Sequence, residues 1–95
     1  MERGDGKALI SCKVSLGMFS SEREVVIELP DGRRIAALVD KRHVEVERDP
    51  EPDEEVEGRL RVMVVETHKD SAVIDLPQPT MTEGTRFEVP RSFLE

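Results

Sequence analysis

The feature that most constrains this chain is a long alternation of apolar and polar side chains near its N-terminus. Every even-numbered position from residue 8 to residue 18 is apolar: Ala8, Ile10, Cys12, Val14, Leu16 and Met18. The positions between them include Ser11, Lys13 and Ser15. Because successive side chains of a β-strand point to opposite faces, this pattern predicts a strand over 8–18 with one buried face. A helix would distribute the same apolar residues around its circumference and bury no coherent face.

Shorter segments with the same two-residue rhythm follow along the chain, separated by turn-forming residues. We expect strands over 24–29, 35–39, 59–67, 72–76 and 85–89, and one tight helical turn over 91–94. Short strands joined by brief turns are typical of barrels and sandwiches. The predicted fold is therefore all-β, a small single-domain barrel of about five to seven short antiparallel strands. An SH3-like or irregular barrel is preferred, with an OB-like barrel as the alternative, because the OB type usually carries a helix where this chain has an acidic loop.

One hairpin is predicted in detail, because its turn residues and its apolar positions agree on a single register. The Pro-Asp-Gly sequence at 30–32 suits a tight turn, since proline presets φ, aspartate bonds to the turn backbone and glycine tolerates a positive φ. A three-residue loop pairs Leu29 with Arg33 and aligns the apolar faces of the two strands. The same register sets Glu28 opposite Arg34, a favourable cross-strand pair. We expect a type I turn followed by a bulge at the glycine.

The net charge of −7 is concentrated in one segment of the chain. Residues 45–57 contain eight acidic side chains and one basic side chain, which together sum to −7. The acidic residues are Glu45, Glu47, Asp49, Glu51, Asp53, Glu54, Glu55 and Glu57. Two prolines and the crowding of like charges predict an exposed acidic loop at 47–58. A helix over 53–66 is an alternative, although Gly58 and the β-branched residues after it favour a strand.

Length and cysteine content limit the organisation of the chain. With 95 residues there is room for one domain, which we place at 8–95 after a flexible polar leader at 1–7. The single cysteine, Cys12, excludes an internal disulfide and falls on the apolar face of the first strand, where a buried, inert thiol is expected. No apolar run approaches the length of a membrane span, and the N-terminus lacks the hydrophobic segment of a signal peptide. We therefore expect a cytoplasmic protein without membrane contact.

No motif in the sequence indicates catalysis, a metal site or a cofactor. The chain has no Gly-x-Ser-x-Gly elbow, no His-Glu-x-x-His helix and no paired Cys-x-x-Cys. Asp40 and His43 are close enough in sequence for an Asp–His pair, but a solvated turn of mixed charges explains them better. The two histidines would need a third ligand to bind zinc, and the sequence singles out none. We predict that the protein is not an enzyme and binds no cofactor and no metal.

Apolar side chains that are out of phase with the buried face favour a role in protein association. Val26, Ala36 and Leu38 are expected close together on the outer face of two adjacent strands, and Val65 is expected to pair with Val73. Exposed apolar patches are a common means by which proteins bind one another. The predicted contact surface combines Val26, Ala36 and Leu38 with an acidic element of Glu51, Asp53, Glu54 and Glu55. The predicted function is a non-enzymatic protein-interaction or accessory module that binds a protein partner or itself.

Contact with nucleic acid is the alternative function. We expect Lys41 and Arg42 to form a basic patch beside Arg33 and Arg34 on the same strand. Single-strand binders stack bases on aromatic side chains, and this chain has three phenylalanines and no Trp or Tyr. The acidic balance of the chain also opposes binding to phosphates. The alternative is therefore limited to a local contact with structured RNA.

Overall fold

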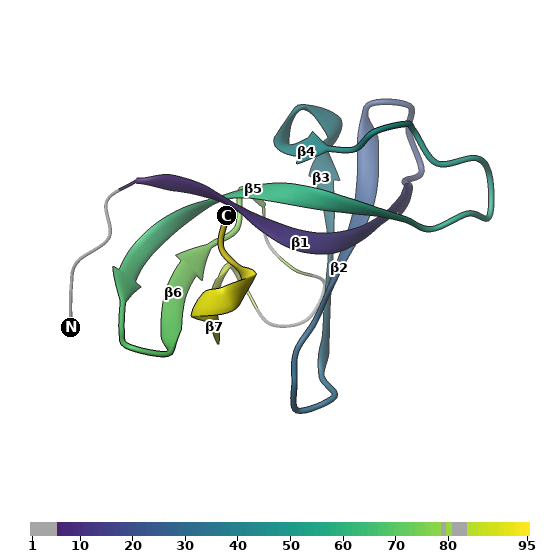
Figure 1. The fold of residues 1–95 in the computed structure, drawn as a ribbon. Helices are drawn as coiled ribbons and strands as arrows, with labels where there is room; N and C mark the ends of the chain where they lie inside the picture. The colour runs from purple at the N-terminus through teal and green to yellow at the C-terminus, as the bar shows by residue number, and fades with distance from the viewer. Residues whose placement is uncertain (1–5, 79, 81–83) are drawn as a thin grey trace.

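The computed structural model describes residues 6–78, 80 and 84–95, which form an all-β domain (Figure 1). In chain order its strands and 3₁₀ turns are β1 (Lys7–Leu16), β2 (Glu22–Glu28), β3 (Arg34–Asp40), η1 (Lys41–His43), β4 (Val44–Glu45), β5 (Val56–Thr67), β6 (Ser71–Asp75), β7 (Arg86–Pro90) and η2 (Arg91–Phe93). The described residues contain no α-helix. The predicted fold class is therefore confirmed.

The strands form one curled antiparallel sheet, a half-barrel with the spatial order β3-β2-β1-β5-β6-β7, and β4 pairs with β5. The long strand β1 pairs with β2 through residues 13–16 and with β5 through residues 7–14. Three hairpin-connected strands followed by a long return to the side of the first define a Greek key, which describes β1, β2, β3 and β5. OB-like barrels share the Greek-key order, although the connection after β3 holds η1, β4 and a loop instead of an α-helix.

The core consists of the inward-facing aliphatic side chains of these strands. The buried apolar residues are Ile10, Cys12, Val14, Val25, Val26, Ile27, Leu29, Ile35, Ala37, Val39, Leu60, Val62, Val64, Ala72, Ile74, Leu76 and Val89. Apart from Val26, all of them lie where the two-residue rhythm predicted a buried side chain. Full burial of one large aliphatic side chain contributes roughly 1.5–3 kcal/mol, so this repeated inner face is the main source of stability.

The β2–β3 hairpin has the predicted register and turn. Glu28 lies opposite Arg34, and the Leu29 amide donates to the Arg33 carbonyl at 2.9 Å. The turn closes through a hydrogen bond from the Gly32 amide to the Leu29 carbonyl (3.0 Å). Gly32 has a φ of +92°, a conformation that glycine adopts without steric cost. This is the geometry of a three-residue loop that ends in a glycine bulge.

The first strand is shorter than the alternation suggested, and its last two apolar positions are exposed. β1 ends at Leu16, whose side chain is 40% exposed, and Met18 lies in the following turn with 83% exposure. The chain turns here through a hydrogen bond from the Gly17 amide to the Glu22 carbonyl (3.2 Å). A β-carbon on Gly17 would lie 2.7 Å from the Cβ of Glu22, so the close approach requires glycine. The prediction that Leu16 and Met18 belong to the buried face is wrong.

β5 begins inside the segment that the sequence assigned to the acidic loop. Residues 56–58 pair with residues 12–14 of β1, so the strand starts at Val56 and the loop itself spans residues 46–55. The helix considered over 53–66 is not formed. Pairing with the central strand β1 determines where β5 begins. This pairing extends β5 further towards the loop than the residue pattern of β5 predicted.

The expected pairing of Val65 with Val73 is wrong. Val73 lies opposite Glu66, and the register shifts between Val64 and Glu66. The additional residue on β5 is a β-bulge, which bends a strand and increases its twist. A bulge at this place suits a strand that curls around the core.

The C-terminal end of the chain joins the sheet beside β1. Leu9 and Glu95 exchange two backbone hydrogen bonds, of 3.4 and 2.8 Å. They lie on the edge of β1 that pairs with β2 further along. η2 is the predicted tight helical turn, and Phe93 and Leu94 after β7 pack against the core.

The leader expected at 1–7 is described only in its last two residues. Lys7 begins β1, and the Gly6 carbonyl accepts a hydrogen bond from the Val64 amide (2.9 Å). Residues 1–5 lie outside the described part of the chain.

A Gly58→Ala substitution should destabilise the fold. A β-carbon at Gly58 would lie 2.7 Å from Val46 Cγ1, 2.8 Å from Val14 Cγ2 and 3.0 Å from the Glu45 carbonyl oxygen. Overpacking of this kind costs about 1–3 kcal/mol, which urea denaturation would detect as a lower midpoint. Gly6→Ala is the control, because nothing lies within 4 Å of a β-carbon at Gly6. An unchanged midpoint for Gly58→Ala would contradict the close packing of Val46 against β1 and β5.

Candidate functional site

Three connections meet at one end of the barrel, towards the upper right of Figure 1. They are the β1–β2 turn (residues 17–21), η1, and the loop of residues 46–55, which we call the acidic loop. The Lys41 amide donates to the Ser21 carbonyl at 2.8 Å and joins η1 to the turn. Arg23 Nη2 lies 3.3 Å from Asp49 Oδ1 and joins β2 to the acidic loop. Segments that are distant in sequence therefore form one surface.

Arg23 holds this end of the barrel together from the inside. It lies opposite Leu16 in the β1–β2 pair and is only 6% exposed. Its Nη1 donates to the carbonyls of Ser20 (3.0 Å) and Glu22 (2.7 Å), while Nη2 faces Asp49. A buried charge is stable only when hydrogen bonds and a counter-charge compensate for the lost water. Arg23 therefore ties the backbone of the β1–β2 turn to the acidic loop.

The turn that Arg23 fixes carries large exposed apolar side chains. Met18 is 83% exposed, Phe19 is 66% exposed and the neighbouring Leu16 is 40% exposed; we call these three residues the apolar tip. Exposed apolar side chains that gather in one place mark interaction sites. Sequence reasoning missed this site because Leu16 and Met18 continue the rhythm of the buried face. The signal that could have revealed it is Gly17, which ends the strand.

The acidic loop has a defined conformation that its own charges support. Arg48 binds Glu54 with both arms of its guanidinium, at 2.7 and 2.6 Å. Glu54 Oε1 also accepts from the Glu51 amide (2.8 Å), and the Glu54 amide donates to the Glu51 carbonyl (3.0 Å). The last bond encloses Pro52 and Asp53, and Asp53 has a φ of +63°, as in a type II turn. The loop is exposed as predicted, but it is folded rather than merely solvated.

The acidic side chains that were predicted to act as one electrostatic element have different roles. The Glu54 carboxylate is bound within the loop. Glu55 lies 3.9 Å from Arg34, a residue that the sequence assigned to RNA contact. Glu51 and Asp53 are exposed, and the described residues give neither of them an ion pair. The element that faces solvent therefore consists mainly of Glu51 and Asp53.

The basic residues predicted for RNA contact do not form a single patch. Arg33 and Arg34 lie at the start of β3, whereas Lys41 and Arg42 follow its end. Arg33 is bound by Asp31 at 2.9 Å, and Arg42 lies 4.0 Å from the carboxylate that precedes η1. The strand separates the two pairs because its residues run in extended conformation between them. Lys41 and Arg42 remain near the apolar tip.

The predicted patch of Val26, Ala36 and Leu38 is assembled but largely covered. Val26 lies directly opposite Ala36, and Leu38 follows two residues later on the same face of β3. Val26 is 8% exposed, and the other two residues are partly buried. Lys13, which lies opposite Val26 on β1, forms an ion pair with Glu57. The patch therefore offers less apolar surface than the apolar tip.

The groups that the sequence considered for chemistry have structural contacts. Asp40 Oδ1 accepts a hydrogen bond from the Arg42 amide (3.0 Å) and caps η1, so this carboxylate supports the turn that contains His43. Cys12 is buried, and burial together with the charge of Glu57 raises the pKa of its thiol to about 12. A thiol with so high a pKa is unreactive, as expected. In the described part of the chain, no cluster of three or more His, Cys, Asp or Glu side chains is arranged to hold a metal ion.

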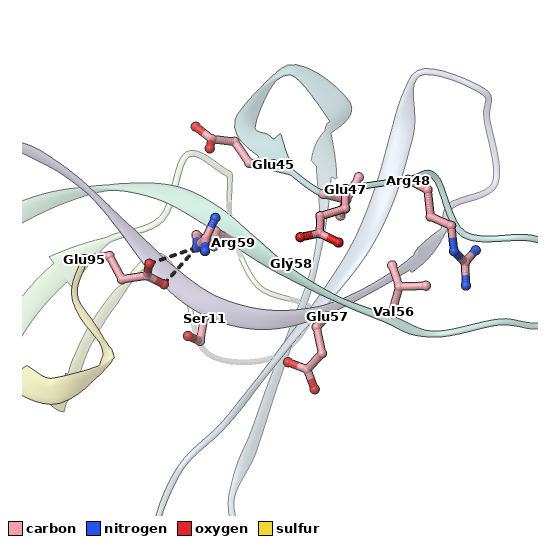
Figure 2. A pocket seen from close by; sticks show the side chains of 10 residues that line it. Ser11, Glu45, Glu47, Arg48, Val56, Glu57, Gly58, Arg59 and Glu95 are labelled. Atoms are coloured by element: carbon pink, nitrogen blue, oxygen red, sulfur yellow. Dashed lines mark hydrogen bonds and ion pairs between the residues drawn. The ribbon is translucent and has the colours of Figure 1, made fainter.

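A groove of about 500 Å³ lies beside the acidic loop, with β4 on one side and the C-terminal residue on the other (Figure 2). Its lining carries side chains of both charges (Figure 2). Arg59 binds Glu95 at 2.9 Å, Glu45 lies 3.4 Å from Arg61, and Arg48 is held within the loop. Small-molecule sites are mostly apolar with a few convergent polar groups. Most charged side chains of this groove are instead paired with other groups of the chain, and among its charged lining residues Glu47 has no ion pair in the described residues.

Comparison with known protein families finds no matching family model, and comparisons with curated proteins and with solved structures find no significant match. Within the described residues, no helix has the length and the apolar character needed to cross a membrane.

Replacing Glu54 with glutamine should remove a pH-dependent part of the stability. The hydrogen bond from Arg48, assisted by the Glu51 amide, lowers the pKa of Glu54 from 4.5 to about 2. A carboxyl group whose pKa is lower in the folded chain stabilises the fold above its unfolded pKa, and this contribution is lost as the pH falls through the folded value. The wild type should therefore melt at a higher temperature than Glu54→Gln at neutral pH, and the difference should vanish as the pH falls from 4.5 to about 2.

Thermal denaturation followed by circular dichroism across this pH range measures the difference. Glu51→Gln is the matched control, because its side chain has no ion pair in the described part of the loop. A difference between wild type and Glu54→Gln that stays constant with pH would contradict the role of the Arg48–Glu54 pair.

Proposed function

We propose that this chain is a non-enzymatic protein-interaction or accessory module, with the apolar tip as its main contact surface. The observation that carries the proposal is the exposure of Met18 and Phe19 on a turn whose backbone is held by Arg23. Side chains presented on a pre-organised backbone lose less conformational entropy on binding. Phenylalanine and methionine are also enriched in protein interfaces.

Charged side chains around the apolar tip support a contact with a defined orientation. Lys41 on η1 and both Glu51 and Asp53 on the acidic loop are exposed. Charges at the rim of an interface steer association and disfavour wrong partners. The patch of Val26, Ala36 and Leu38 is a secondary contact in this proposal.

A cytoplasmic location is part of the proposal. The single cysteine is a buried free thiol, and proteins that hold together without disulfides suit a reducing compartment. The partner is a protein, either a different chain or a second copy of this one.

A photo-crosslinking phenylalanine analogue in place of Phe19 should give a discrete protein adduct in cells that produce the chain. The reason is that the side chain at this position projects from a fixed turn into the proposed interface. Irradiation followed by mass spectrometry would detect an adduct larger than the 10.7 kDa chain. The control carries the same analogue in place of Lys69, an exposed residue in the β5–β6 turn, away from the tip (Figure 1). Absence of a protein adduct at position 19, or equal adducts at both positions, would argue against the proposal.

Contact with structured RNA is the second candidate function, and one observation favours it. The hydrogen bond from Lys41 to Ser21 places the basic start of η1 beside the turn that carries Phe19. Surfaces that bind nucleic acid often combine basic side chains with an aromatic ring. Asp49 and the exposed carboxylates of the acidic loop oppose it, which is why it stands second.

The double substitution Lys41→Glu with Arg42→Glu should abolish any salt-dependent retention of the chain on immobilised structured RNA, because it removes the positive charge beside Phe19. Arg33→Glu with Arg34→Glu is the matched control, since these residues lie at the other end of β3 and should be dispensable. Elution at increasing salt concentration measures the effect. Lack of retention of the wild type at low salt would exclude the RNA contact.

A further inference from the structure

The charges around the apolar tip are arranged with opposite signs on its two sides. Lys41 is exposed on η1, and Glu51 and Asp53 are exposed on the acidic loop. In Figure 1, η1 and the outer part of the acidic loop lie on opposite sides of the β1–β2 turn. Contacts made through Ser21 and Asp49 hold both segments against this end of the barrel. The surface therefore has an apolar centre, a cationic flank and an anionic flank.

Several other charged groups at this end lie near an opposite charge of the same chain. Arg23 faces Asp49, and Arg48 binds Glu54. Arg42 lies near the carboxylate that caps η1. In the part of the chain that the structure describes, no such ion pair is found for Lys41, Glu51 or Asp53. Glu47 is also exposed without an ion pair in the described residues, but it lines the groove beside β4 (Figure 2). Lys41, Glu51 and Asp53 are therefore the charged side chains that we assign to a contact between molecules.

A surface of this composition is complementary to itself. In a two-fold dimer, if residue i of the first copy contacts residue j of the second, then residue j of the first copy also contacts residue i of the second. Rotation by half a turn about an axis through the apolar tip places the cationic flank of one copy on the anionic flank of the other. Both ion pairs then form, and the apolar side chains of the two copies pack together between them.

We infer that a second copy of this chain is the partner of the apolar tip, in a two-fold dimer with Met18 and Phe19 at its centre. Lys41 of each copy faces Glu51 and Asp53 of the other. This inference rests on the proposed function, since it names the partner of the same surface. A standard interface buries about 800 Å² on each partner and has an apolar core with a polar rim. The apolar tip forms the core here, and η1 and the acidic loop form the rim.

Sedimentation velocity from low micromolar to near-millimolar concentration tests the dimer. The mass of the wild type should rise reversibly from 10.7 kDa towards twice that value. Phe19→Ser should weaken association about tenfold or more, because loss of a central interface side chain often exceeds 1.4 kcal/mol. Met63→Ser is the matched control, since Met63 is an exposed apolar residue on β5, outside the apolar tip, and it should leave association unchanged.

Charge reversal distinguishes a two-fold contact from non-specific apolar association of the tip. Lys41→Glu alone, and Glu51→Lys with Asp53→Lys in another variant, should each weaken self-association, because like charges then face each other. A mixture of the two variants should restore dimers, since every flank again meets an opposite charge. These substitutions lie on exposed positions, and circular dichroism would verify that each variant is folded.

Three results would overturn the inference: a wild type that stays monomeric at every concentration, a dimer whose affinity is unchanged by Phe19→Ser, or a mixture of the charge variants that does not dimerise. If the chain is monomeric but position 19 still crosslinks to a different protein, the dimer is excluded and the proposed function is still supported. If the chain is monomeric and gives no adduct at position 19, both the dimer and the proposed function are contradicted.

Discussion

β1 is paired along both of its edges, and the rest of the domain depends on this arrangement. β2 occupies one edge through residues 13–16, and β5 occupies the other through residues 7–14. The inward side chains of β1 therefore lie at the centre of the core rather than at its margin, and Ile10 and Val14 are completely buried. The same pairing brings Gly58 of β5 against Val14, where Val46 can pack only because glycine has no side chain. The start of the acidic loop is thus placed by the core.

Most acidic side chains of residues 45–57 lie near basic groups of the same chain. Five carboxylates of the acidic segment 45–57 lie near a basic group from the same chain: Glu45 near Arg61, Asp49 near Arg23, Glu54 near Arg48, Glu55 near Arg34, and Glu57 near Lys13. Exposed ion pairs contribute little stability individually, but the pair made by Arg23 involves a buried guanidinium that needs its counter-charge. Net charge therefore overstates the free negative surface, and the exposed acids of the loop without an ion pair in the described residues are Glu47, Glu51 and Asp53.

The parts of the structure that the sequence predicted are those that local rules control. Strand periodicity identifies the inward residues, and the turn residues at 30–32 determine that Glu28 meets Arg34. What the sequence could not predict depends on contacts between distant segments. Met18 obeys the rhythm of β1, yet no partner strand continues beside it, so it is exposed. From the sequence alone, Arg23 is a polar residue beside a turn. Its counter-charge, Asp49, lies far along the chain and cannot be assigned from local sequence. The candidate site was missed for this reason, whereas the fold class was not.

An exposed phenylalanine and methionine on one turn are an aggregation hazard unless something limits how copies can meet. A contact between two different patches can propagate without end, whereas a two-fold contact between identical patches closes on itself. The charged flanks of the apolar tip favour the closed two-fold contact. Lys41 of one copy attracts Glu51 and Asp53 of the other only when the two copies are related by a half-turn. A parallel approach would set like charges against each other. In the proposed dimer, the same charges that orient the partner therefore also restrict the assembly to a pair.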